Sequence, residues 1–132
     1  MMIALLVMPC LIVSCRQSNK EMKEQLILAD SVAINYFKGD GTMDTVTAVK
    51  IVKDKKMIEE LANAATGSTV NNKTGCGFDG SLHFFKSNIV MQDIYFRMSG
   101  DTCSLFTYTF NKKKYSSELP AATKQMLTQL KN

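Results

Sequence analysis

The apolar positions of this chain follow two different periods along its length. Val32, Ile34 and Tyr36 alternate with small or polar residues, which predicts a strand within residues 26–37. A turn-rich composition at 38–44 and a second β-branched run at 45–52 then indicate a hairpin. Three more strands are predicted at 81–87, 89–98 and 103–111, and a short one at Tyr115–Ser117.

A helical period appears in two segments. Residues 55–66 carry apolar side chains at i, i+3, i+4 and i+7, and Asp54 stands where a helix N-cap is expected. Pro120 suits the start of a final helix over 120–132. The apolar stripes of the two helices comprise Ile58, Leu61, Ala62 and Ala65, and Ala122, Met126, Leu127 and Leu130.

The order of these elements is ββα-βββ(β)-α, without the strand–helix alternation that builds parallel sheets. We therefore predict an α+β fold in which an antiparallel sheet of about five strands carries two helices on one face. The other face would then expose Phe85, Tyr95 or Tyr108 as a partner surface. The alternative is that a second layer or local packing covers these rings.

The first fourteen residues form an uncharged, almost continuous apolar run, "MMIALLVMPCLIVS", which ends at Cys15. This run is too short to span a bilayer as a helix, which takes about 20 residues, but it suits the apolar region of a signal peptide. It has no Lys or Arg before the apolar run, which departs from the usual signal. The alternative is an uncleaved, buried N-terminal helix.

Ile12-Val13-Ser14-Cys15 resembles the lipobox of bacterial lipoproteins. The resemblance implies that residues 1–14 are a cleaved signal peptide and that Cys15 carries the lipid, including palmitate. Residues 15–25 would then be the lipidated end and a polar tether, and residues 26–132 a single domain. A brief helix through Met22–Leu28 is the alternative for the end of the tether. Arg16 is not the Asp that retains some lipoproteins in the inner membrane, so the resemblance favours the outer membrane of the cell envelope.

The remainder resembles small uncharacterised lipoproteins of Bacteroides-like bacteria in its "CGFDG…C" pair and element order. A sheet-plus-helix module of this kind is also similar to the β-lactamase-inhibitor-like and PepSY-like folds, which bind proteins or peptides.

With Cys10 removed and Cys15 lipidated, Cys76 and Cys103 are left as a pair. An exported protein with two remaining cysteines favours a disulfide between them, which would stabilise the fold by about 3–4 kcal/mol. Two free thiols or a metal pair are the alternatives. The metal pair lacks a C-x-x-C motif and has only a distant His83 to add, so we predict no metal site.

The chain contains no motif that identifies a reaction. The formal charge of +4 is too small, without a recognition motif, to indicate a nucleic-acid binder. No cofactor motif is present either. Our first hypothesis is a non-enzymatic envelope lipoprotein domain that binds a protein or peptide, and the second is a carrier of a small ligand or glycan. An enzyme would have to use His83 with Asp79 or Asp93.

Overall fold

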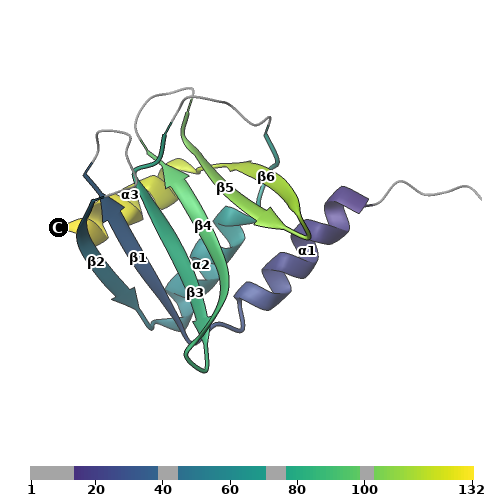
Figure 1. Ribbon diagram of the computed structural model, residues 1–132, viewed down its shortest axis with the longest axis horizontal. Coiled ribbons are helices and arrows are strands. Elements are labelled where there is room, and N and C mark those ends of the chain that lie inside the picture. Colours follow the sequence, from purple (N-terminus) through teal and green to yellow (C-terminus); the bar gives the residue numbers. More distant parts are fainter. Residues whose placement is uncertain (1–13, 39–44, 71–76, 99–102) are drawn as a thin grey trace, which may run out of the picture.

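The computed structural model describes residues 14–38, 45–70, 77–98 and 103–132. Within these residues the chain forms three helices and six strands (Figure 1). In chain order they are α1 (Ser14–Leu26), β1 (Ser31–Phe37), β2 (Val46–Val52), α2 (Lys55–Ala65), β3 (Gly80–Lys86), β4 (Ile89–Arg97), β5 (Leu105–Phe110), β6 (Lys113–Glu118) and α3 (Ala121–Lys131).

The strands form one sheet in the order β2-β1-β3-β4-β5-β6, and every neighbouring pair is antiparallel. The predicted α+β class and antiparallel sheet are confirmed, and from β1 onward the element order is the predicted one. The counts differ. The described residues contain six strands rather than about five, because the expected short strand extends over Lys113–Glu118, and three helices rather than two.

The additional helix is α1, in the segment that we assigned to a tether. Met22 and Leu26 lie one helical turn apart and are 1% and 0% exposed in the core. Their neighbours within residues 19–25 are half-buried or exposed, and these positions are occupied mostly by polar residues. Two apolar side chains at i and i+4 are enough to dock a helix once a sheet is present to receive them. The folded domain therefore begins before Leu26.

All three helices cover the same face of the sheet. Val32, Ile34 and Tyr36 of β1 point into the core, where they pack with residues from the helices. The predicted cap of α2 is present, with the Met57 amide donating to Asp54 Oδ1 at 2.9 Å. Figure 1 shows α2 and α3 behind the sheet and α1 beside the β5–β6 hairpin.

Two buried tyrosines tie helices to the sheet. The Tyr36 hydroxyl of β1 donates to the Leu127 carbonyl of α3 at 2.6 Å, and the Tyr108 hydroxyl of β5 donates to Asn19 Oδ1 of α1 at 3.1 Å. Burial raises the pKa of both phenols to about 12, and for Tyr108 the neighbouring Tyr115 adds to the effect. Both side chains therefore favour the protonated, neutral form when folded.

The position of α1 in the core predicts that Leu26→Ala lowers the free energy of unfolding by about 2–5 kcal/mol, since it removes a fully buried side chain and leaves a cavity. Leu28→Ala is the matched control, because Leu28 is 57% exposed and its loss should change stability by less than about 0.5 kcal/mol. Urea unfolding followed by circular dichroism measures both. Equal, small effects of the two substitutions would contradict the docking of α1.

The raised pKa of the two tyrosines predicts alkaline destabilisation. An unfolded phenol ionises near pH 10, whereas these fold with a pKa of about 12, so their contribution is complete below pH 10 and is lost as the pH rises toward 12. The loss should be on the order of 1–2 kcal/mol per tyrosine. Tyr36→Phe and Tyr108→Phe should each flatten the pH dependence of the urea midpoint between pH 9 and 11.5. An unchanged slope in the double variant would refute this origin.

Candidate functional site

The face of the sheet opposite the helices, here called the open face, carries the residues whose side chains alternate with the core positions. It includes Asn35 of β1, His83 and Phe85 of β3, Asp93 and Tyr95 of β4, and Thr109 of β5. Among the described residues, no helix packs on this face, and it is therefore the natural place to look for a binding site.

Two of the three aromatic residues predicted for a partner surface lie on the open face. Phe85 and Tyr95 are half-buried there, in register with Ser31 and Ser81 of the adjacent strands. Tyr108 does not join them. It shares the core side of β5 with Phe106 and is 3% exposed, so the prediction that its ring is exposed on the open face is wrong, although it contributes to the wall of the cavity described next.

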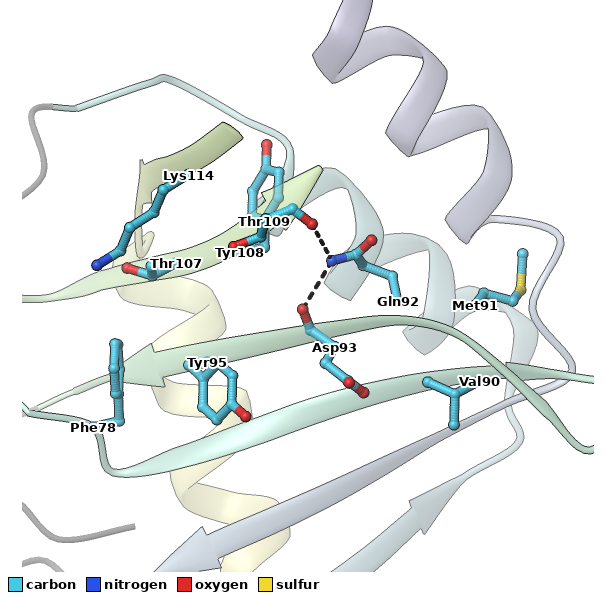
Figure 2. Close-up of a pocket in the computed structure, with 10 residues that line it drawn as sticks. All are labelled: Phe78, Val90, Met91, Gln92, Asp93, Tyr95, Thr107, Tyr108, Thr109 and Lys114. Carbon is cyan, nitrogen blue, oxygen red and sulfur yellow. Dashed lines mark hydrogen bonds between the residues drawn. The ribbon is translucent and has the colours of Figure 1, made fainter. Parts of the chain in front are cut away.

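A cavity of about 640 Å³ lies where β4 and β5 separate (Figure 2). This volume is within the range of small-ligand sites, about 300–1,000 Å³. Its lining comes from the two strands, from the segment before β3 and from β6. The lining residues are Phe78, Val90, Met91, Gln92, Asp93, Tyr95, Thr107, Tyr108, Thr109 and Lys114.

A bulge in β4 accounts for the separation. The register between β3 and β4 shifts between Phe84 and Phe85, which pair with Gln92 and Val90 and leave Met91 as an extra residue. A bulge bends its strand and increases the local twist. The first half of β4 therefore turns away from β5, and the pairing of these strands covers only Tyr95↔Thr107, Phe96↔Phe106 and Arg97↔Leu105.

The side chain of Gln92 spans the gap between the two strands. Its Nε2 donates to the carbonyl oxygens of Asp93 and Thr109, both at 3.0 Å, as the dashed lines in Figure 2 show. Continuing the register from Tyr95↔Thr107 would place Asp93 opposite Thr109. The carboxamide thus stands where backbone ladder bonds would otherwise form.

The walls of the cavity differ in chemistry. Phe78 and Tyr95 form an aromatic wall, with ring centroids 5.3 Å apart and an interplanar angle of 41°. Across from it, Lys114 of β6 extends beside Thr107 (Figure 2), and it pairs in register with Thr109. The site therefore combines an apolar surface, hydroxyl and amide groups, and a cation.

His83 lies next to the cavity in a hydrogen-bonded cluster. Its Nδ1 is 2.5 Å from Asp93 Oδ1, and its Nε2 is 2.8 Å from Ser81 Oγ and 3.2 Å from Asn35 Nδ2. The order Ser-His-Asp is that of a hydrolytic triad. Ser81, however, is only 2% exposed, so its hydroxyl is covered by its neighbours, and neither Ser81 nor His83 lines the cavity. The cluster's direct effect is to fix Asp93 at the cavity rim.

Asp79, the other carboxylate that we considered for an enzyme, does not approach His83. It accepts from the Met98 amide at 2.6 Å and from Arg97 Nη1 at 3.3 Å. These bonds connect the start of β3 to the end of β4 and give Asp79 a structural role. Of the two carboxylates named with His83, the structure brings only Asp93 to it.

The cysteine predictions are only partly within the described residues. Cys103 is disulfide-bonded, but Cys76 lies outside the described residues, so the pairing of the two stays a prediction. Within the described part of the chain, no group of three or more His, Cys, Asp or Glu side chains is arranged to hold a metal ion. Nor does that part contain a helix of the length and apolar character needed to cross a bilayer.

Several residues of the site had no signal in the sequence. Gln92 and Met91 owe their positions to the bulge, and Phe78 and Lys114 lie outside the strands that we predicted at 81–87, 103–111 and Tyr115–Ser117. Comparison of the chain with protein-family models, curated proteins and solved structures finds no match.

Proposed function

We propose that this protein is a non-enzymatic lipoprotein domain of the bacterial cell envelope that binds a protein or peptide partner in the cavity between β4 and β5. The observation that carries the proposal is the cavity itself, about 640 Å³ in volume, which opens on the face left uncovered by the helices. Phe85 lies on the same face and extends the apolar surface toward β3. Aromatic anchors beside polar groups are typical of protein-binding surfaces.

The lipobox resemblance supports attachment through Cys15, with the outer membrane favoured by Arg16. In α1, Cys15 precedes Met22, the first buried position among the described side chains, by seven residues, or about 10 Å of helix. A lipid on Cys15 would therefore hold the domain close to the membrane, without a long flexible tether. Two or more acyl chains make such attachment effectively stable.

The coverage of Ser81 supports a binding function over hydrolysis. A serine nucleophile has to reach the substrate carbonyl, whereas this hydroxyl lies under the open face and bonds to His83. No cofactor is needed for the proposed function.

A small ligand or glycan is the second candidate. The cavity volume suits such a ligand, and the Phe78–Tyr95 wall could stack on an apolar ring face while Gln92 and Thr109 bond to its polar groups.

The anchor is tested with Cys15→Ala in the full-length precursor, expressed in its native envelope. We expect the unaltered chain in the membrane fraction, with the intact mass of residues 15–132 plus acyl chains. The variant should lack the acyl mass and retain residues 1–14, since the resemblance implies that cleavage depends on the acylated cysteine. A chain that retains residues 1–14 and an unmodified Cys15 would overturn the lipoprotein assignment.

The binding site is tested by replacing Tyr95 with the photoreactive p-benzoylphenylalanine in the native envelope, followed by mass spectrometry of the adducts. We expect a discrete adduct at position 95 and none at Gln125, which is exposed on α3. A protein or peptide adduct supports the first candidate, and a saccharide or small-molecule adduct supports the second.

Thr109→Arg, which fills the cavity from an exposed position, should reduce the Tyr95 adduct at least tenfold. Thr45→Arg, also at an exposed threonine but before β2, is the matched control and should leave it unchanged. Equal adducts at positions 95 and 125, or no effect of Thr109→Arg, would overturn the cavity as the site.

A further inference from the structure

The site in which β4 and β5 separate has two strand edges facing each other across a cavity. On its other side, β4 pairs with β3, and β5 pairs with β6, so both edges belong to a formed sheet. Their mutual pairing ends at Tyr95↔Thr107. Unpaired strand edges are templates for another strand. We propose that an extended peptide with an acidic side chain inserts between β4 and β5 as an additional strand, an inference that rests on the cavity being the binding site.

The hydrogen bonds of Gln92 indicate which groups can bind between β4 and β5. A carboxamide has the same donor and acceptor groups as a peptide bond, and this one donates to a carbonyl of each strand. An incoming peptide can offer N–H groups to the same two oxygens as Gln92 turns out to solvent. Because hydrogen bonds are exchanged rather than lost, the displacement has a small net cost.

The dimensions favour entry from one end. Gln92 Nε2 lies 3.0 Å from each of the Asp93 and Thr109 oxygens, so these oxygens are within about 6 Å of each other. An inserted strand needs its two neighbours about 9–10 Å apart, twice the normal strand spacing. Because β4 and β5 diverge from their paired end toward the start of β4 and the end of β5 (Figure 1), the peptide would enter at that wide end and displace Gln92 as it advances.

The lysines at the cavity favour a peptide with an acidic side chain. Lys114 lines the cavity, and Lys112 and Lys113 are exposed at the adjoining β5–β6 turn. Within the described residues, the ion pairs are His83–Asp93 and Arg97–Asp79, so none of these lysines is paired there. The Asp93 carboxylate is bonded to His83 and in Figure 2 points away from Lys114. An Asp or Glu of the peptide beside Lys114 would complement this positive end.

The probe is a fluorescein-labelled pool of N-acetylated, C-amidated heptapeptides of Val, Ile, Thr and Tyr with one Glu, titrated against the full mature chain by fluorescence anisotropy. The tightest sequence is resynthesised with N-methyl groups at each amide in turn. An inserted strand bonds to its neighbours through its backbone on both sides. We therefore expect methylation to weaken binding at least tenfold at the amides that face β4 or β5 within the split.

Two variant pairs complete the test. Gln92→Ala removes the competing carboxamide and should tighten binding about three- to tenfold, whereas Gln129→Ala on α3 should not change it. Lys114→Glu should weaken the Glu-containing peptide at least fivefold, and Lys56→Glu, at an exposed position of α2, is its control.

Strand insertion is overturned if no peptide of the pool binds, if no backbone methyl group weakens binding, or if Gln92→Ala weakens it. It is also overturned if the Tyr95 adduct is a glycan or a second copy of this chain. In each of these cases, the cavity remains the binding site as long as Thr109→Arg abolishes the crosslinked adduct at position 95. If Thr109→Arg leaves the adduct at position 95 unchanged, the proposed function itself is overturned.

Discussion

Packing of the three helices on a single face of the sheet is the constraint on which the rest of this structure depends. Each strand must send alternate side chains toward that face, so the core takes the apolar half of β1, β3, β4 and β5. The sheet packs closely at Gly80, where a Cβ atom would overlap the Asn35 carbonyl and the Phe96 ring. The other half of each strand forms the open face, and its polar content, including the Asn35–His83–Asp93 cluster, is consistent with its contact with solvent.

The cavity arises because β4 does not pair with both β3 and β5 along its whole length. The extra residue Met91 keeps the first half of β4 paired with β3 but twists it away from β5, and the pairing there stops. The Gln92 carboxamide then satisfies two carbonyl groups that the lost ladder would have bonded. A side chain can leave such a position more easily than a backbone segment can, because only its own torsion angles need to change. The site is therefore closed by the part of β4 that is easiest to move.

The sequence predicted those elements that are marked by a local pattern of residues. It did not predict the features that depend on pairing between strands far apart in the chain. The period and the Asp54 cap placed α2, and alternation placed the strands. The helix α1 was predicted only as a brief alternative within a tether, because Met22 and Leu26 are the buried positions among its described side chains up to Leu26. Tyr108 was assigned to the wrong face because a strand's alternation defines two faces without saying which one the helices cover. The cavity depends on a bulge and on a bond between Gln92 and Thr109, and no local pattern encodes either.

The helix α1 relates the proposed anchor to the cavity. Asn19, one helical turn after Cys15, accepts from the Tyr108 hydroxyl and donates to Thr69, so the first part of α1 is fixed to the sheet beneath the site. With the lipid on Cys15, this helix would position the cavity relative to the membrane as well as complete the core. A partner would then have to present its extended segment near the membrane surface, where the high local concentration of anchored molecules compensates for a modest intrinsic affinity. A peptide-directed site at such a location need not bind tightly, since proximity supplies part of the binding free energy.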